Sequence, residues 1–301
     1  MAYQLFGVSA EQNIGDTAIV MFSHLGSNVE SDTGGDAAYI ADALRLPVLA
    51  VDRPYDLKPL HGNRPSMHQV ELLDQQLREG ALDALAANGI TRVILFGRSA
   101  GGLGALTAAR TAALSDLICA VHVQDPIGWF DVTVRQGRKI FKAYQKHQRQ
   151  RIDDVNDQEL VRAEHTHLGR ITKIQRMFGN LARSLLDIYS NQYVWSTSAA
   201  RRHAEAIAAT RPDVTLDIRF AEDTYVLGDQ QPEHLQEILL KLRAATESDI
   251  AQPINVQAVP NTVHASFDRR PFSALHLAEV VTRAMAGEAP KDRPLEPTAG
   301  Q

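Results

Sequence analysis

The segment with the clearest potential for chemistry is a serine between two glycines. Ser99 has Gly97 two residues before it and Gly101 two residues after it, and the apolar run Val93–Phe96 comes just before this motif. At the apex of a sharp turn from a strand into a helix, large side chains in the glycine positions would clash with the neighbouring chain. The motif therefore predicts a nucleophilic serine. The competing interpretations are a glycine-rich turn that only packs and a phosphate-binding loop, whose Gly-Lys-Ser/Thr signature is missing here.

A serine hydroxyl is a weak nucleophile at neutral pH and needs a general base. Of the eleven histidines, His264 is the candidate, because it follows the predicted strand Ile254–Val259 and precedes the predicted helix Ser273–Ala286. The carboxyl ends of parallel strands meet at one edge of a sheet, so a loop at His264 would reach the edge that carries Ser99. The alternative is a loop histidine without a catalytic role.

The base in turn needs a carboxylate that fixes its tautomer and stabilises the imidazolium. We prefer Asp223, because it comes directly after the predicted strand Val214–Phe220. Asp125 is the alternative acid, since it follows the predicted strand Leu117–Val123, and Glu222 is a weaker candidate. Each of the three could instead cap a loop.

The tetrahedral intermediate of acyl transfer needs two N–H donors for its oxyanion. The backbone N–H of Ala100, directly after the serine, is the first candidate. The second is expected from the loop after the predicted strand Ala18–Phe22, at Leu25 or Gly26.

The elements that position these residues form a regular series. Short apolar runs without polar alternation are separated by longer segments of helical periodicity, which is typical of parallel strands covered on both faces. The sequence thus predicts an α/β fold with a mostly parallel, doubly wound sheet built from right-handed βαβ units. The remaining predicted elements are a strand at Pro47–Val51 and helices at Asp36–Leu44, Ser66–Asn88, Ala100–Ala113 and Pro232–Ala245.

The series is interrupted by a helical, basic insertion. Between Ile127 and His203 the chain has 14 Arg or Lys and 7 Asp or Glu, so this segment carries +7 while the whole chain carries −5. We expect residues 1–126 and 204–286 to form the core domain and residues 127–203 to form a cap. Residues 287–301, with three prolines and several charges, are predicted to be disordered.

Composition excludes several classes of function. The net charge of −5 gives no general attraction to nucleic acid or to an anionic membrane. No run approaches the roughly 18 apolar residues of a membrane span, and the first residues lack a secretory signal, so we expect a cytoplasmic protein. The single cysteine, Cys119, is expected to be a buried small side chain, and His165 and His167 are interpreted as helix surface. No metal site is therefore expected.

Over most of its length, Ala18–Ala286, the chain resembles the α/β-hydrolase superfamily. The serine motif, the order nucleophile, acid and base along the chain, and two loops that follow early strands carry this resemblance. The motifs are Gly97-Arg98-Ser99-Ala100-Gly101-Gly102, His24-Leu25-Gly26 and Asp52-Arg53-Pro54.

The resemblance implies an α/β-hydrolase fold in which the insertion at residues 127–203 forms a helical cap or lid. A serine in place of an aspartate nucleophile argues against the dehalogenase and epoxide hydrolase branches. Two departures from the family pattern concern the site. Leu25 separates the usual His-Gly pair, and Val263 replaces the glycine that usually precedes the histidine.

These observations predict a serine hydrolase that cleaves a carboxylic ester or thioester of a small molecule through an acyl-enzyme, without a metal or cofactor. The basic cap favours a substrate with an anionic part or an acidic partner, although a solvated basic surface would have the same composition. The alternatives are an acyltransferase with the same triad, a non-catalytic binding protein on the same scaffold, and docking of the cap on a polyanion. A homodimer is the candidate assembly.

Overall fold

The computed structural model describes the greater part of the chain outside the insertion and the C-terminal segment. The described residues are 2–7, 16–24, 29–30, 32–52, 65–129, 198–211, 213–224, 226, 237–238, 240–242 and 254–286. Most of the predicted cap, all of the predicted tail and most of the predicted helix Pro232–Ala245 lie outside them.

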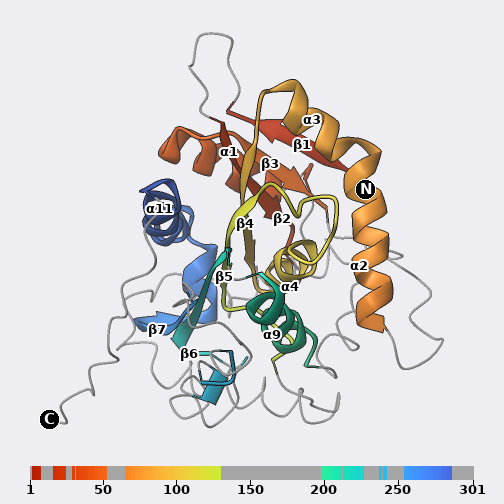
Figure 1. Ribbon diagram of the computed structural model, residues 1–301. Coiled ribbons are helices and arrows are strands. Elements are labelled where there is room, and N and C mark those ends of the chain that lie inside the picture. Colours follow the sequence, from red (N-terminus) through yellow and green to blue (C-terminus); the bar gives the residue numbers. More distant parts are fainter. Residues whose placement is uncertain are drawn as a thin grey trace, which may run out of the picture.

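The described strands form one seven-stranded sheet in the order β1-β3-β2-β4-β5-β6-β7 (Figure 1). Only β1, at the edge, runs antiparallel to its neighbour, and every other pair is parallel. The doubly wound sheet predicted from the sequence is therefore present. The strands are β1 Tyr3–Phe6, β2 Thr17–Phe22, β3 Val48–Val51, β4 Arg92–Arg98, β5 Ile118–Gln124, β6 Thr215–Asp223 and β7 Ile254–Val263.

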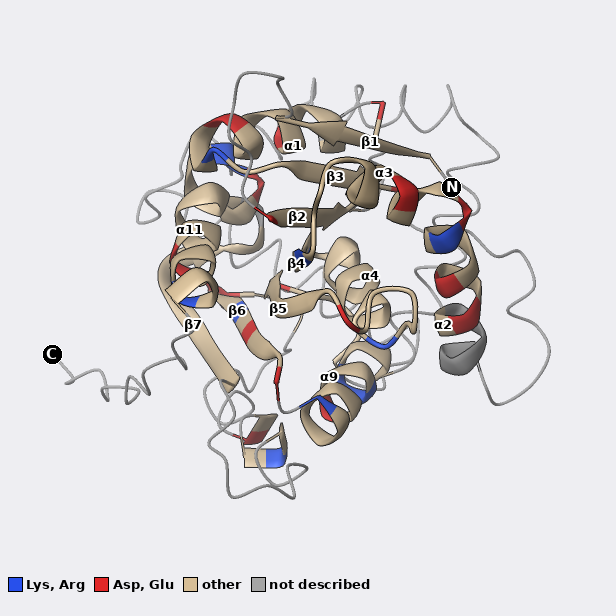
Figure 2. Ribbon diagram, turned by 45° about the horizontal axis from the view of Figure 1, so that its top comes forward, with Lys and Arg blue, Asp and Glu red and all other residues tan. Residues whose placement is uncertain are grey.

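Helices cover both faces of the sheet (Figure 2). On one face α1 (Asp32–Leu44) and α11 (Arg270–Ala286) pack on alternate residues of β2, β3 and β4. On the other face lie α2 (Pro65–Gln76), α3 (Leu82–Ala87), α4 (Ala100–Ala108) and α9 (Ala199–Thr210). Every residue of β2 and β3 is buried, which explains the continuous apolar runs in the sequence.

The predicted helix Ser66–Asn88 is divided by a π-helical turn, η1, at Leu77–Ala81. Gly80 within this turn has φ +152, and a Cβ there would lie 2.4 Å from the hydroxyl of Tyr3. The turn thus makes room for β1, an edge strand that the sequence analysis did not predict. Gly89, expected just after the helix, has φ +68, and its N–H donates to the carbonyl of Ala86.

The face of β5 and β6 toward α11 is polar, which the apolar pattern did not predict. His122 and Asp217 are fully buried, and their Nδ1 and Oδ1 atoms are 2.8 Å apart. Arg219 donates to the same Oδ1 atom, while Arg283 and Asn255 donate to Oδ2. Burial alone would raise the pKa of Asp217, but the hydrogen bond from His122 and the nearby arginine hold this pKa well below its usual range.

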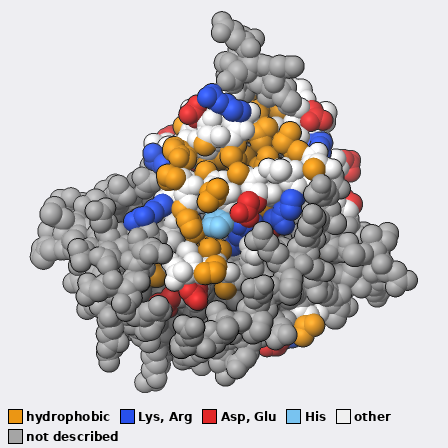
Figure 3. All heavy atoms as spheres, turned by 90° about the vertical axis from the view of Figure 1, so that its left-hand side faces the viewer, with side chains coloured by type: hydrophobic (Ala, Val, Ile, Leu, Met, Phe, Trp, Pro, Cys, Tyr) orange, Lys and Arg blue, Asp and Glu red, His pale blue; other side chains and the backbone are white. Residues whose placement is uncertain are grey.

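The surface beside this polar cluster carries both signs of charge. Arg219 reaches Glu279 of α11, with a distance of 2.7 Å between Nη2 and Oε2, and the glutamate is half exposed. Figure 3 shows acidic and basic side chains next to each other, and next to hydrophobic ones, on the described part of this face. Cys119 of β5, expected to be buried, is only partly buried, and burial raises the pKa of its thiol.

A buried histidine of α9 lies against the end of α4. His203 is fully buried, and its Nδ1 is 3.0 Å from Nη1 of Arg110. Burial, and then the positive charge of Arg110, lower the pKa of His203 from 6.5 to about 3. The imidazole is therefore neutral in the folded protein at every pH above about 3.

This depressed pKa predicts a loss of stability in acid. The unfolded chain binds the histidine proton below pH 6.5 and the folded chain does not, so the stabilisation is complete above pH 6.5 and is lost as the pH falls toward 3. At pH 5 the loss from this residue should be about 2 kcal/mol. Urea denaturation at pH 7 and pH 5 should therefore show a smaller acid effect in His203→Gln than in the wild type, by that amount. Equal acid effects in the two proteins would contradict the prediction.

Candidate active site

Ser99 occupies a strained turn between β4 and α4. Its backbone has φ 49 and ψ −121, a region that residues other than glycine adopt at a cost of about 1–3 kcal/mol. Three backbone hydrogen bonds hold the turn. The Ser99 N–H donates to the carbonyl of Gln124 at 2.9 Å, and the Ser99 carbonyl accepts from the N–H groups of Gly102 and Ile127. The serine is partly exposed at the carboxyl end of a central strand.

The two glycines of the motif lie where the chain passes closest to itself. A Cβ on Gly97 would lie 2.2 Å from the carbonyl oxygen of Gly101, and a Cβ on Gly101 would lie 2.5 Å from the carbonyl oxygen of Phe22. Both contacts are with backbone atoms, which cannot move aside as a flexible side chain can. The crowding predicted from the sequence on both sides of the serine is therefore confirmed.

The expected oxyanion donors are described only in part. Ala100 is the first residue of α4, and the first N–H groups of a helix have no partner within the helix. All residues of α4 are buried, so the helix lies tightly under the turn and its amino end is fixed beside Ser99. Leu25 and Gly26, the candidates for the second donor, lie outside the described residues.

His264 contacts a carboxylate at the same edge of the sheet. The histidine begins a short 3-10 helix, η2 (His264–Asp268), directly after β7. Its Nδ1 atom is hydrogen bonded to Oδ2 of Asp125, which follows β5. The side chain of Asp125 is 1 % exposed and that of His264 is 17 % exposed. A buried carboxylate thus holds one side of an imidazole that remains accessible.

The carboxylate of Asp125 is itself fixed by the end of β6. Its Oδ2 accepts a hydrogen bond from Oγ1 of Thr224 at 2.7 Å, and its Oδ1 accepts one from the N–H of Ala221 at 3.2 Å. The backbone N–H of Asp125 donates to the carbonyl of Arg219. The residue has φ +45, an uncommon conformation that directs the chain out of β5 at this point.

The two other acid candidates lie in β6 next to a register irregularity. Asp223 pairs with Val263 across the shift, and Oε2 of Glu222 accepts from the N–H of Asn261, whose φ is +56. Glu222 therefore stabilises the turn before His264. The contact of His264 with Asp125 favours the alternative acid over Asp223, because the turn after β5 brings the Asp125 carboxylate to the imidazole.

Sequence reasoning did not identify Thr224 or Arg98 as residues of interest. Thr224 directly follows Asp223, and no local pattern distinguishes its hydroxyl as a donor to Asp125. Arg98 lies inside the serine motif, at the end of an otherwise apolar strand. A charged residue in such a position is a signal that its side chain has buried partners.

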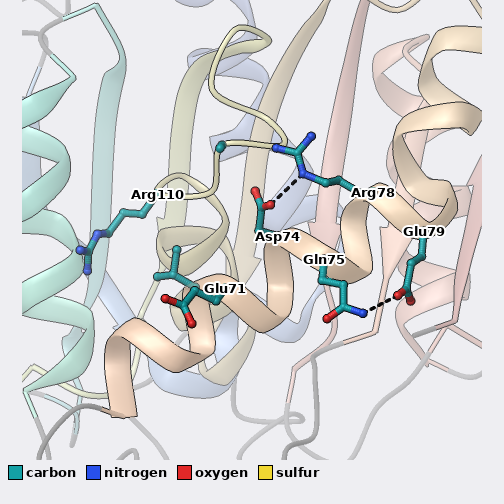
Figure 4. A pocket seen from close by; sticks show the side chains of 8 residues that line it. Glu71, Asp74, Gln75, Arg78, Glu79 and Arg110 are labelled. Carbon is teal, nitrogen blue, oxygen red and sulfur yellow. Dashed lines mark hydrogen bonds and ion pairs between the residues drawn. The ribbon is translucent and has the colours of Figure 1, made fainter.

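A separate groove of about 540 Å³ lies on the α2 side of the molecule (Figure 4). Its lining side chains bind each other: Arg78 donates to Asp74 and Gln75 donates to Glu79, both at 2.8 Å. The groove is bounded by Arg110, which lies past the carboxyl end of α4, whereas Ser99 precedes the amino end of the same helix.

Among the described residues, no cluster of three or more His, Cys, Asp or Glu is arranged for a metal ion.

Comparison with solved structures identifies the fold. The chain is similar to EstE1, a thermophilic carboxylesterase cloned from a metagenomic library, with a TM-score of 0.55 and 16 % identity over 96 % of this chain and 85 % of that one. It is also similar to a thermophilic esterase from Thermogutta terrifontis (TM-score 0.50, 12 % identity, 94 % and 93 % covered). A monoacylglycerol lipase from Paleococcus ferrophilus gives a TM-score of 0.50 at 13 % identity, with 94 % and 98 % covered.

No protein-family model and no curated protein sequence matches the chain. The structural likeness together with the mostly parallel seven-stranded sheet shows that the protein has the α/β-hydrolase fold. Within the described residues, no helix combines the length and the apolar character that crossing a membrane requires.

The crowding at Gly97 yields a testable stability difference. Gly97→Ala would place a methyl group against backbone atoms and should lower the free energy of unfolding by roughly 1–3 kcal/mol or more. Gly104→Ala is the comparison in the following helix. The three atoms nearest to its added methyl would be side-chain atoms of the buried Phe22, at 3.1 to 3.3 Å, and alanine favours a helix, so the loss should be smaller. Urea denaturation of both variants measures the difference. A Gly97→Ala variant as stable as the wild type would show that the turn does not need the glycine.

Proposed function

We propose that the protein is a serine hydrolase that cleaves a carboxylic ester or thioester, with Ser99 as nucleophile, His264 as base and Asp125 as the acid. The observation that carries the proposal is the hydrogen bond between His264 and Asp125 at the sheet edge where the strained Ser99 turn lies. Solved structures of similar fold include a carboxylesterase, an esterase and a monoacylglycerol lipase, which agrees with ester hydrolysis as the reaction class.

The contact with Asp125 determines which ring nitrogen can act. Because Nδ1 of His264 is bonded to the carboxylate, this nitrogen would carry the proton, and Nε2 is the nitrogen that would accept one from the serine. The buried carboxylate also stabilises the imidazolium that forms during the reaction. The hydrogen bonds from Thr224 and Ala221 keep this carboxylate in place throughout.

The proposed reaction has two stages. Ser99 Oγ attacks the carbonyl carbon while His264 Nε2 takes the hydroxyl proton, and the oxyanion is stabilised by the N–H of Ala100 and a donor at Leu25 or Gly26. The C–O or C–S bond then breaks, the leaving group takes the proton from His264, and an acyl-serine remains. Water then attacks this ester while His264 takes a proton from the water. The proton passes to Ser99 Oγ as the carboxylic acid product leaves, which restores the serine.

The other features of the proposal come from the sequence. The substrate is a small acyl ester or thioester, and the basic segment 127–203 favours one with an anionic part. We propose that this segment forms the cap of the protein. Transfer of the acyl group to an acceptor other than water would use the same groups, so product analysis with added alcohols or amines separates hydrolysis from acyl transfer.

The nucleophile is tested with p-nitrophenyl esters and acyl thioesters of increasing chain length and with a fluorophosphonate probe. The wild type should hydrolyse part of the panel and be labelled, whereas Ser99→Ala should lose labelling and at least about 10³-fold in kcat. A wild type that is neither active nor labelled would instead support the alternative of a non-catalytic binding protein. The chain-length profile measures the size of the acyl pocket.

The acid is tested by two matched substitutions at neighbouring strand ends. Asp125→Asn should lower kcat by about 10⁴-fold, because an amide stabilises the wrong imidazole tautomer. Asp223→Asn should leave kcat within a few-fold of the wild type. The assay uses the panel ester that the wild type hydrolyses fastest. The opposite ranking of the two variants would restore Asp223 as the acid.

A further inference from the structure

A buried arginine directly precedes the serine. Arg98 is the last residue of β4, and its side chain is 4 % exposed. A guanidinium remains charged at any pH that a protein tolerates, and burying this charge is costly unless it is paired and hydrogen bonded. Its partners therefore indicate why the chain places an arginine here.

Arg98 joins two segments that are far apart in the sequence. Its Nη2 donates to Oδ2 of Asp36 in α1 at 2.5 Å, and its Nη1 donates to the carbonyl of Phe267 at 2.7 Å. Phe267 lies in η2, the same short helix that His264 begins, and is itself buried. The planar guanidinium thus spans from the nucleophile turn to the backbone that carries the histidine.

A second arginine completes the arrangement. The other oxygen of Asp36, Oδ1, accepts a hydrogen bond from Nε of Arg270 at 2.8 Å. Arg270 begins α11, and one residue separates it from the end of η2. The carboxylate of Asp36 therefore lies between two guanidinium groups, one from β4 and one from α11. Through Phe267 and Arg270, this cluster holds the chain just after the histidine.

We propose that Arg98 is a positioning residue that fixes the His264 segment relative to Ser99. The inference rests on the proposed function of Ser99 and His264. Asp125 holds the imidazole ring from one side, and the Arg98 cluster holds the backbone that follows it. Because Arg98 and Ser99 are adjacent, a shift of η2 away from the arginine is also a shift of the base away from the nucleophile.

The test compares Arg98→Lys with Arg92→Gln. A lysine keeps the charge but is a single point donor without the guanidinium fork, so it cannot bind Asp36 and the Phe267 carbonyl in the same way. Arg92 is the matched control at the other end of β4, since its Nη2 donates at 2.8 Å to the carbonyl of Ala284 in α11. Arg98→Lys should lower kcat on the best panel ester by about 10–100-fold with little change in KM. Arg92→Gln should leave both constants within a few-fold.

A second readout does not depend on turnover. The proton on Nδ1 of His264, bonded to a buried carboxylate, should give a downfield NMR resonance that is missing in His264→Ala. In Arg98→Lys this resonance should weaken or disappear, and the rate of labelling of Ser99 by a fluorophosphonate should fall with kcat. In Arg92→Gln both should match the wild type.

The outcomes separate the two proposals. If resonance, labelling rate and kcat in Arg98→Lys all equal those of the wild type, the positioning role is overturned while the hydrolase proposal stands. If the wild type is neither labelled nor active, the hydrolase proposal fails, and the resonance still decides whether Arg98 positions His264. Should Arg98→Lys not fold, Asp36→Asn is measured in the same way, because it removes the carboxylate that joins Arg98 to Arg270. The same losses are expected, and their absence would overturn the role.

Discussion

The candidate site depends on the hydrogen bond between His264 and the buried carboxylate of Asp125. The carboxylate is buried away from water. The cost of this burial is offset because Thr224 and the N–H of Ala221 also donate hydrogen bonds to it. These groups come from the ends of β5, β6 and β7, three adjacent parallel strands. The pairing of the sheet thus brings residues 139 positions apart in the sequence into contact.

The same sheet edge holds Ser99, the proposed nucleophile, through Gln124. Its carbonyl accepts from the N–H of Ser99, and its side chain binds Ser273 of α11 through Oε1 at 2.7 Å and His122 through Nε2 at 3.0 Å. Asp125 is the next residue. The polar cluster on β5 and β6 therefore fixes the end of β5, which bonds to the backbone of Ser99 and leads into Asp125, the proposed acid. Buried polar groups that are satisfied in this way specify one arrangement of neighbouring strands.

Strain at Ser99 is tolerated because the surrounding structure leaves the turn no alternative. Gly101 lies against the backbone of Phe22, and Gly102 lies against Pro126, where a Cβ would be 2.7 Å from the Cβ of the proline. Glycine is needed at these two positions of α4, since a larger side chain there would push the helix away from β2 and from Pro126. The cost of the unusual backbone conformation is offset by this close packing.

The sequence by itself predicted strands β2 to β7 and most of the helices between them, and it proposed two members of the candidate site, Ser99 and His264. Continuous apolar runs predicted buried parallel strands, and the glycine spacing predicted the crowded turn at Ser99. The position of His264 after the last strand indicated that it lies at the same edge. These features are local, because each depends on residues close together in the chain.

The hydrogen bond of His264 Nδ1 to Asp125, which favours Asp125 over Asp223 as the proposed acid, is seen only in the tertiary structure. In the sequence both follow a predicted parallel strand, and nothing local distinguishes them. The positive φ of Asp125 and the irregular pairing at the end of β6 decide which carboxylate meets the imidazole. The partners of Arg98 and the edge strand β1 likewise depend on contacts between distant segments, because the energy of a buried charge or of an added strand depends on groups that only the folded chain brings together.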